Sequence, residues 1–441
     1  MFTIHSSCRK TSIRPRLLAA VLGLCAISGA ARADLDAYVK KPDPTFAWSA
    51  TEVVQTPAGS ITTIDLTSQT WQGIVWKHDL RIYSPKDVPA SDAMLFFITG
   101  GGTGSKPDEG DHKQGFALAR LCGARVAVLR QVPNQPLLGD KTEDALIAET
   151  FVRYLETKDE SWPLLFPMVK SAVRGMDAVQ EWAKKTGEHE VKRFVVTGAS
   201  KRGWTTWLTG AVDDRVIAIA PMVIVMLNLN KQGPNQLKVW GKYSEQIDDY
   251  VQRGLMERTH TEQETKLWKM VDPYTYRDRL KKPKLLINGT NDRYWTLDAI
   301  DLYWDGLEGP KSLVELPNAG HGLDQNRDWA LHGLGAFFRH VTADRPMPLV
   351  TWDKAKAGDG VLGWTVHTSV LPKAARLWQA HSTTRDFREA PWQSTPLTPA
   401  LEIAGRAPTG GDYSALMVEL EYEVDGLVYH LTTSFFEPKA P

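Results

Sequence analysis

The chain has 441 residues, of which 42% are hydrophobic and 24% are charged, and its formal net charge at pH 7 is zero. This composition is typical of a globular protein and excludes a disordered or fibrous chain, which would have fewer aliphatic side chains or a strong compositional bias. The length is sufficient for one large hydrophobic core and a second, smaller one.

The first 33 residues have the pattern of a secretory signal peptide. Four basic residues between Arg9 and Arg16 precede an apolar run from Leu17 to Gly29, and Ala31-Arg32-Ala33 is a small-x-small cleavage site before Asp34. The apolar run is shorter than the roughly 20 residues that cross a bilayer. We expect cleavage between Ala33 and Asp34, a periplasmic or secreted protein, and no transmembrane span in the mature chain. An uncleaved membrane anchor is the alternative.

Export changes what the charges and cysteines imply. The first 33 residues contain five basic residues and no acidic one, so the mature chain would have 47 basic and 52 acidic residues, a net charge of about −5. A net negative charge argues against a nucleic-acid partner. Cys8 and Cys25 would leave with the signal peptide, and Cys122 alone cannot form an intrachain disulfide. Cys122 lies in an apolar stretch, where we expect it to pack in the core.

Strands dominate residues 52–85, and beyond them apolar strands alternate with long helical stretches, which is typical of a parallel sheet. The predicted strands of that sheet are short apolar runs: Ala93 to Thr99, Arg125 to Leu129, Arg193 to Thr197, Val216 to Pro221, Lys284 to Asn288 and Ser312 to Leu316. Apolar runs of this kind suit strands that helices cover on both faces. The predicted helices span residues 142–158, 162–185, 295–307 and 326–341.

One connection in this pattern is unusually long. About 57 residues separate the strand that ends near Met226 from the strand that begins at Lys284, more than a single crossover helix requires. The connection is polar, helical in character and rich in Trp and Tyr. We expect residues 228–280 to form a cap over the carboxyl edge of the sheet, where open α/β sheets bind ligands. An ordinary helical excursion is the alternative.

After about Pro346 the helical pattern stops and alternating apolar runs begin. The predicted strands are Gly363 to Val370, Ala374 to Ala380, Ala415 to Val424 and Leu427 to Ser434. This pattern predicts a C-terminal antiparallel β-sandwich domain over residues 346–441, following an α/β domain over residues 34–345.

A strand, a tight turn and a helix start surround Ser200, in the order Thr197-Gly198-Ala199-Ser200-Lys201-Arg202-Gly203. This arrangement predicts a nucleophile elbow, in which a strained turn projects the serine hydroxyl above the sheet. One feature differs from the usual G-x-S-x-G pattern: Arg202 stands two positions after the serine, and the glycine is third.

An acid and a histidine follow in the chain order that such a fold requires. Asp292 ends a loop after the strand at Lys284, and His321 lies between two glycines after the next strand. We therefore predict a Ser200-His321-Asp292 triad in which the histidine exchanges the proton and the aspartate orients the imidazole. Each of the three residues also has an ordinary structural interpretation, as a turn serine, a turn acid and a solvent-facing histidine.

The glycine-rich segment Thr99 to Gly104 follows a predicted strand, at the position of the oxyanion loop of lipases. We expect the backbone N–H groups of Lys201, Gly101 and Gly102 to stabilise the oxyanion. A phosphate-binding loop is the alternative, but the segment lacks the closing Gly-Lys-Ser/Thr.

Four residues are predicted to bind the substrate: Arg202, Trp204, Trp240 and Trp295. The basic side chains of Lys201 and Arg202 could bind an acidic group of the substrate or pair with acids of the cap. Histidines outside the proposed triad show no spacing typical of metal ligands, so we predict no metal site and no cofactor.

Several long motifs resemble the PhoPQ-activated pathogenicity-related protein family. They are Thr99-Gly100-Gly101-Gly102, Gln131-Val132-Pro133-Asn134-Gln135-Pro136, Glu143-Asp144-Ala145-Leu146-Ile147-Ala148, Ser200-Lys201-Arg202-Gly203-Trp204, Val271-Asp272-Pro273-Tyr274, Pro317-Asn318-Ala319-Gly320-His321 and Arg385-Asp386-Phe387-Arg388. The resemblance covers nearly the whole mature chain. It implies an exported protein of the bacterial envelope with an α/β-hydrolase fold.

The turn after Ser200 is also similar to that of glucuronoyl and related carbohydrate esterases, in which a basic residue after the serine assists the oxyanion. That similarity implies the same role for Lys201. Together these features predict an exported serine hydrolase that acts on a carboxylic ester, with a small-molecule or carbohydrate ester as substrate. A peptidase or amidase shares the acyl-enzyme chemistry, and a non-catalytic binding or signalling protein is the rival class; Arg202 is the residue that most favours that rival. The oligomeric state does not follow from the sequence.

Overall fold

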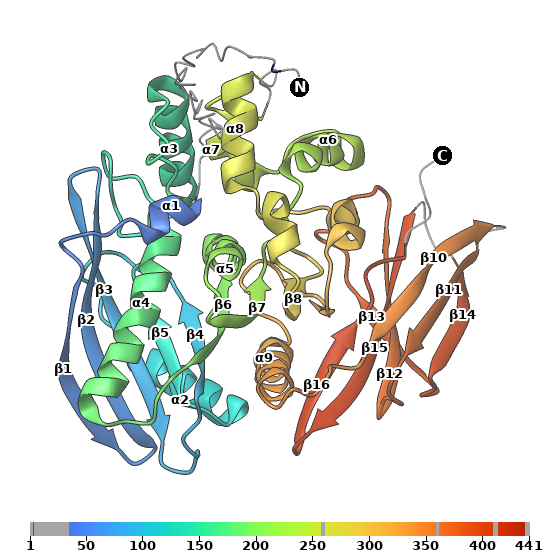
Figure 1. The fold of residues 1–441 in the computed structure, drawn as a ribbon. Helices are drawn as coiled ribbons and strands as arrows, with labels where there is room; N and C mark the ends of the chain where they lie inside the picture. Colours follow the sequence, from blue (N-terminus) through green and yellow to red (C-terminus); the bar gives the residue numbers. More distant parts are fainter. Residues whose placement is uncertain (1–2, 4–34, 257–260, 359–360, 409–412, 437–441) are drawn as a thin grey trace. The chain divides into compact units, whose positions relative to one another are not determined.

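The structure, a computed structural model, describes Thr3 and residues 35–256, 261–358, 361–408 and 413–436 (Figure 1). Apart from Thr3, the predicted signal peptide and its cleavage site lie outside these residues. In the part of the chain that the structure describes, no helix is long and apolar enough to cross a membrane.

A nine-stranded sheet forms the centre of the fold, with the strand order β1-β2-β3-β5-β4-β6-β7-β8-β9. Its strands are β1 (Ala47–Thr56), β2 (Gly59–Trp71), β3 (Ile74–Pro85), β4 (Ala93–Ile98), β5 (Val126–Leu129), β6 (Arg193–Ala199), β7 (Val216–Met222), β8 (Lys284–Gly289) and β9 (Lys311–Leu316). The pairs β1–β2, β2–β3 and β3–β5 are antiparallel, and β5, β4, β6, β7, β8 and β9 run parallel. This mostly parallel sheet, in which β4 lies between β5 and β6, confirms the predicted α/β-hydrolase fold.

Helices cover both faces of the sheet, as the apolar strands predict (Figure 1). Helices α4 (Leu165–Thr186) and α5 (Lys201–Val212) pack on one face, and α2 (Glu109–Cys122) and α9 (Arg327–Thr342) pack on the other. Helix α1 (Leu35–Lys40) packs on α4, and α3 (Glu143–Thr157) lies beyond the carboxyl ends of the strands. The lone Cys122 is buried, and burial raises the pKa of its thiol.

Helix α2 was not predicted, because its first two turns are polar and contain two glycines. It begins with a capping box, in which the side chains of Asp108 and Asp111 each accept a hydrogen bond from the other's backbone N–H. Gly115 lies in its interior because a Cβ atom there would stand 2.6 Å from the ring of Tyr83. The glycine therefore allows the helix to approach strand β3.

The predicted helix over residues 295–307 is wrong. The segment instead forms two short 3-10 helices, η3 (Leu297–Leu302) and η4 (Trp304–Gly306). Tyr303 separates them with a non-helical backbone, φ −143°, and its ring is buried in the core. The local sequence favours a continuous helix, but the burial of this aromatic ring in the core overrides that preference and interrupts the helix.

The connection between β7 and β8 is helical throughout most of its length. It contains α6 (Leu229–Trp240), η1 (Glu245–Ile247), α7 (Asp248–Val251), α8 (Glu262–Val271) and η2 (Pro273–Arg279). Helices α7 and α8 pack on α3. The buried Asp272 accepts hydrogen bonds from the backbone N–H groups of Asn228, Leu229 and Tyr274, so it joins the beginning of α6 to the end of α8. Burial raises the pKa of this carboxyl to about 6, against those three hydrogen bonds.

Two antiparallel sheets follow α9, in the orders β10-β11-β14 and β13-β12-β15-β16. Their strands are β10 (Val350–Gly358), β11 (Val361–Thr368), β12 (Ala374–Ser382), β13 (Gln393–Leu397), β14 (Glu402–Pro408), β15 (Tyr413–Val424) and β16 (Leu427–Thr432). Strands β11, β12, β15 and β16 match the predicted runs. Strands β10, β13 and β14 were not predicted, since they are polar or are interrupted by Pro396 and Gly405.

Strand β16 packs on α9 and β9, so apolar side chains of the C-terminal sheets and of the parallel sheet belong to one buried cluster. Val418 and Leu431 contribute to this cluster from the C-terminal sheets, and Phe337 and Val314 from α9 and β9. The division into folding domains at residues 345 and 346 stays a prediction.

Candidate active site

Ser200 lies between β6 and α5 with the backbone angles φ 57° and ψ −125°. A residue with a side chain rarely adopts a positive φ, so the turn is strained, as in a nucleophile elbow. The Ser200 N–H donates to Met222 O on β7 at 2.9 Å, and this bond anchors the turn to the neighbouring strand.

Arg202 fits this turn because Gly198 has no side chain. A Cβ atom on Gly198 would lie 2.9 Å from the Cβ atom of Arg202. A Cβ atom on Gly203 would lie 2.9 Å from Met222 O, so the glycine at the third position after the serine lets α5 approach β7 closely. Gly203, which stands one position later than the glycine of the usual pattern, therefore leaves room for this helix to pack close to the sheet.

Ser200, His321 and Asp292 form a chain of hydrogen bonds. His321 Nε2 lies 2.9 Å from Ser200 Oγ, and His321 Nδ1 lies 2.8 Å from Asp292 Oδ2. The Asp292 side chain is 4% exposed and that of His321 is 27% exposed. Asp292 Oδ1 accepts the backbone N–H of Tyr294 at 2.9 Å, so both carboxylate oxygens have a donor. The structure thus brings together the three residues predicted as the triad.

The ring of Tyr294 packs against the imidazole of His321, with 4.2 Å between centroids. Tyr294 was not predicted as a site residue, although it stands only two positions after Asp292. A tyrosine in a loop has no motif of its own, and its contact with the histidine depends on two loops that meet only in the folded chain.

A second buried carboxyl lies close to Asp292. Glu315 on β9 is 3% exposed, and its Oε1 accepts a hydrogen bond from Asn288 Nδ2 on β8. Burial raises the pKa of Glu315 to about 8; the amide of Asn288 opposes this shift and the charge of Asp292 adds to it. Glu315 is therefore largely protonated at neutral pH and adds little negative charge beside the triad.

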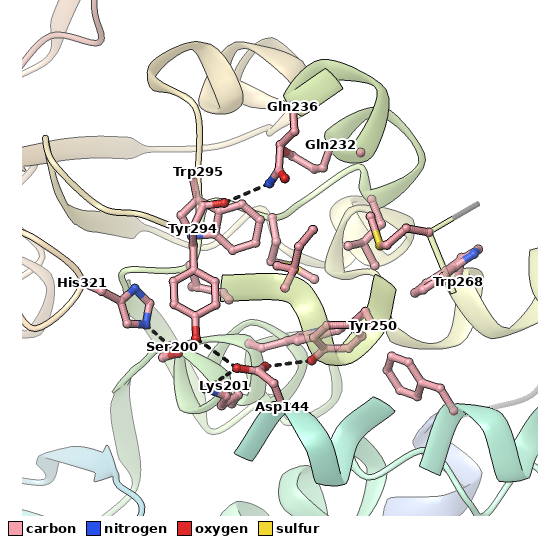
Figure 2. A pocket seen from close by; sticks show the side chains of 18 residues that line it. Asp144, Ser200, Lys201, Gln232, Gln236, Tyr250, Trp268, Tyr294, Trp295 and His321 are labelled. Atoms are coloured by element: carbon pink, nitrogen blue, oxygen red, sulfur yellow. Dashed lines mark hydrogen bonds and ion pairs between the residues drawn. The ribbon is translucent and has the colours of Figure 1, made fainter. Parts of the chain in front are cut away.

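The side chain of Lys201 is paired beside Ser200. Its Nζ lies 2.8 Å from Asp144 Oδ2 and 3.5 Å from Glu143 Oε2. Asp144 also accepts hydrogen bonds from the hydroxyls of Tyr250, at 2.9 Å, and Tyr294, at 3.0 Å (Figure 2). Proximity to Asp144 adds to the effect of burial and raises the pKa values of both tyrosines well above their ordinary value.

Arg202 points away from the pocket. Its guanidinium binds both carboxylate oxygens of Glu143, at 2.7 and 2.8 Å, and donates to Val132 O. Burial disfavours the charge of Glu143, but the bonds from Arg202 outweigh it and hold the pKa of that carboxyl at about 2. This bidentate pair gives Arg202 a structural partner, and Arg202 is absent from the lining of the pocket at Ser200.

The glycine-rich loop packs against the Arg202 side chain. A Cβ atom on Gly100 would lie 2.5 Å from the guanidinium, while Gly101 has φ 107° and Gly102 faces Gln135 O. Neither Gly101 nor Gly102 belongs to the described residues that line the pocket. Their role as oxyanion donors, like that of the Lys201 N–H, stays a prediction.

A pocket of about 700 Å³, including its open mouth, lies beside Ser200 and His321 (Figure 2). It is lined by Asp144, Phe151, Ser200, Lys201, Trp204, Ile224, Met226, Leu229, Gln232, Gly233, Gln236, Ile247, Tyr250, Met256, Trp268, Tyr294, Trp295 and His321. Ten of these residues, from Ile224 to Trp268, lie in the connection between β7 and β8. That connection therefore contributes most of the pocket's lining, and its role as a cap stays a prediction.

Two of the four residues predicted to bind substrate, Trp204 and Trp295, line this pocket. Trp240 does not line it and instead packs against the guanidinium of Arg388, 4.1 Å from its ring centroid. Phe151, on α3, lines the pocket but was not identified, because the sequence does not indicate that α3 lies above the elbow.

A C-terminal segment, residues 385–392, contacts both loops that bear triad residues. Asn318, three residues before His321, forms two hydrogen bonds with the backbone of Trp392, donating at 3.0 Å and accepting at 2.7 Å. Asn291, next to Asp292, donates to the carbonyl oxygens of Phe387, Arg388 and Ala390 at 2.9 to 3.3 Å.

Among the described residues, no group of three or more His, Cys, Asp or Glu side chains could hold a metal ion. The chemistry that this arrangement can perform is nucleophilic attack by Ser200, with proton transfer through His321.

The fold is similar to that of solved esterases. An acetyl xylan esterase 1 from Thermoanaerobacterium sp. JW/SL YS485 is 18% identical with a TM-score of 0.49, over 69% of this chain and 93% of that one. A glucuronoyl esterase from Solibacter usitatus is 12% identical with a TM-score of 0.41, over 69% of this chain and 90% of that one.

Comparison of sequences gives a stronger match. Autocrine proliferation repressor protein A of Dictyostelium discoideum is 34% identical over 375 residues, which are 80% of this chain and 76% of the relative. The family model described as PhoPQ-activated pathogenicity-related protein matches residues 35–388. The chain therefore belongs to the PhoPQ-activated pathogenicity-related protein family.

Proposed function

We propose that this protein is a serine hydrolase that cleaves carboxylic esters through an acyl-enzyme. The observation that carries the proposal is the hydrogen-bonded chain from Ser200 Oγ through His321 to the buried Asp292, with the serine on a strained elbow. Nucleophile, base and orienting acid are each within hydrogen-bonding distance of the next, as the mechanism requires.

In the first half of the reaction, His321 Nε2 takes the proton of Ser200 Oγ as the oxygen attacks the ester carbonyl. Asp292 orients the ring and stabilises the imidazolium. The tetrahedral intermediate collapses as His321 returns the proton to the departing alcohol, which leaves an acyl group on Ser200. Water then repeats the same two steps, releases the acid and restores Ser200.

The oxyanion of each intermediate needs hydrogen-bond donors that are already in place. The backbone N–H of Lys201 is the first donor of helix α5, and the helix dipole favours negative charge there. We assign this N–H to the oxyanion, together with N–H groups of Gly101 and Gly102 on the neighbouring loop. The paired Lys201 side chain places a positive charge beside the same site.

We further propose that the protein is exported, with cleavage before Asp34. The proposal rests on the basic, apolar and small-residue regions of the first 33 residues.

A second candidate function is that of a binding or signalling protein that retains the fold. The name of the Dictyostelium relative, an autocrine proliferation repressor, favours this candidate. Arg202 no longer favours it, because the arginine is accommodated by Gly198 and paired with Glu143.

Hydrolysis of p-nitrophenyl butyrate distinguishes the two candidates. Ser200→Ala should lower kcat/KM by at least about a thousandfold while the protein remains folded, since no other group supplies the nucleophile. Ser312→Ala, at the beginning of β9 and outside the site, is the matched control and should retain full activity. Equal activity of wild type and Ser200→Ala would contradict the proposed function.

A further inference from the structure

The pocket beside Ser200 is apolar along most of its length. In Figure 2 it extends from Ser200 and His321 toward Trp268, on the side of the serine away from the histidine. The apolar side chains in its lining are Phe151, Trp204, Ile224, Met226, Leu229, Ile247, Met256, Trp268 and Trp295. Such a surface binds hydrocarbon by removing it from water.

The charged groups at the near end of the pocket are already paired. Asp144 has donors on both carboxylate oxygens: Lys201 Nζ, Tyr250 Oη and Tyr294 Oη, all within 3.0 Å. A polar substrate group would have to displace one of these bonds to reach the carboxylate. The exchange would leave a buried donor without its partner, which is costly.

The two glutamines in the lining are bonded to the backbone. Gln236 Nε2 donates to Tyr294 O, and its Oε1 accepts the N–H of Ser244. Gln232 Nε2 donates to Leu227 O. Both side chains are no more than 4% exposed. These bonds fix both side chains, so that among the described residues the two amides leave a ligand only the Oε1 acceptor of Gln232.

A site that recognises a sugar needs several convergent hydrogen-bonding groups, because each buried hydroxyl must find a partner. Trp295 Nε1 is buried without a hydrogen-bond partner in the described part of the chain, and one indole N–H does not satisfy a sugar ring. The pocket is therefore suited to a hydrocarbon group.

The acyl side of the ester fits this pocket better than the alcohol side. The departing alcohol takes its proton from His321 Nε2, so it must lie on the histidine side of the serine. The imidazole is 27% exposed, which gives the alcohol a path to solvent there. The acyl group stays bonded to Ser200 and points the other way, into the cavity under the cap.

From these contacts we propose that the substrate is an ester of an apolar acid larger than acetic acid, with a medium-chain aliphatic or aryl acyl group bound beneath cap helices α6 to α8. This inference rests on the proposed esterase function and names the substrate class of that same site.

A series of p-nitrophenyl esters from acetate to hexanoate tests the proposal on the wild-type protein. Each added methylene that is buried should raise kcat/KM by up to about fourfold. A flat series, a preference for acetate, or faster cleavage of an acetylated xylose than of the hexanoate would overturn the proposal.

Gly233, on α6, supplies a variant that fills the pocket. A Cβ atom there would approach the flexible end of Met256 at 3.0 Å, so a leucine at this position projects among the lining side chains. Gly233→Leu should lower the hexanoate-to-acetate ratio of kcat/KM at least tenfold. The matched control is Leu237→Ala, at an exposed position of the same helix, which should leave the ratio unchanged. An unchanged ratio in Gly233→Leu would contradict the proposal. Both kcat/KM values scale with the concentration of folded enzyme, so the ratio does not depend on how much of the variant is folded.

Labelling of Ser200 by a fluorophosphonate separates failure of this inference from failure of the proposed function. A protein that labels at Ser200 but shows no preference for long acyl groups, or cleaves none of the series, refutes the acyl assignment alone. A folded protein that neither labels nor hydrolyses any ester refutes the esterase function itself.

Discussion

At the scale of single residues, the buried carboxyls of Asp292 and Glu315 have different environments. Asp292 is bonded to His321 and to the backbone of Tyr294, whereas Glu315 is buried with the amide of Asn288 as its hydrogen-bond donor. The ionised form of a carboxyl needs donors, so burial with a single amide donor favours the neutral form of Glu315.

Glu315 should make folding stability depend on pH. Its folded pKa of about 8 lies above the unfolded value of about 4.5, so between these values the folded protein binds more protons than the unfolded chain. The stabilisation is fully present below pH 4.5 and is lost as the pH rises toward 8. Glu315→Gln mimics the neutral carboxyl and does not titrate. As the pH rises across that window, the free energy of unfolding of the wild type should fall relative to that of the variant, by up to about 1.4 kcal/mol per pH unit.

Denaturant unfolding of both proteins at several pH values between 5 and 8 measures this difference. Glu52→Gln, at an exposed position of β1, is the control and should show no such trend against wild type. Curves for Glu315→Gln and wild type that stay parallel across the window would show that Glu315 is ionised in the folded protein.

The triad residues could be predicted from the sequence because each has a local signal: a strand before it, glycines around it and a fixed chain order. Their partners could not. Tyr250 has no motif, and the motif that contains Asp144 does not indicate its partners; the two residues come together only because α3 and α7 pack against each other. Trp240 does not line the pocket, and the sequence could not show this, since an aromatic side chain in this connection can point into the pocket or away from it.

At the scale of elements, the C-terminal segment 385–392 joins the loops that bear Asp292 and His321. Asn318 has φ 61°, which asparagine tolerates well, and its side chain forms two hydrogen bonds with Trp392. We infer that Asn318 is a positioning residue, which acts on the reaction through the placement of His321.

Asn318→Gly keeps the positive φ but removes both hydrogen bonds. It should lower kcat by about tenfold or more with a smaller change in KM, because a small displacement of His321 impairs proton transfer more than binding. Asn318→Asp retains the accepting oxygen and should recover part of the activity. Steady-state kinetics on p-nitrophenyl butyrate provide both constants.

Asp425→Gly is the control, because Asp425 also has a positive φ, 48°, but lies in the β15–β16 turn, where it pairs with Arg345. Equal kcat values for the two glycine variants would mean that the C-terminal segment does not position His321.

The elements that the sequence predicted best are those with a strong apolar pattern. Strands β4 to β9 and helices α3, α4 and α9 lie within a few residues of the predicted ranges. Helix α2 and strands β13 and β14 were missed because their stability comes from packing: Gly405 on β14, for example, accommodates the ring of Trp364 on β11. Such contacts between distant segments leave no local signal.

At the scale of the whole molecule, the fold brings the triad together from the carboxyl ends of three parallel strands of one sheet. Ser200 follows β6, Asp292 follows β8 and His321 follows β9, while the connection after β7 contributes most of the pocket's lining. The sequence predicted the class of fold but not the order of the strands, since hydrophobic periodicity does not say which strands are neighbours in the sheet. The fold therefore places a nucleophile, a base and an acid at the carboxyl edge of the central sheet, beside a pocket lined mostly by apolar side chains.

Fluorophosphonate labelling of the purified protein, with the modified peptide located by mass spectrometry, tests the central claim most directly. We expect labelling at Ser200, because the reagent reacts with a serine that a neighbouring base activates. His321→Ala should abolish labelling, whereas Asp425→Gly should retain it. A folded protein that is not labelled, or labelling of Ser200 that persists at the same rate in His321→Ala, would show that His321 does not activate Ser200 as a nucleophile.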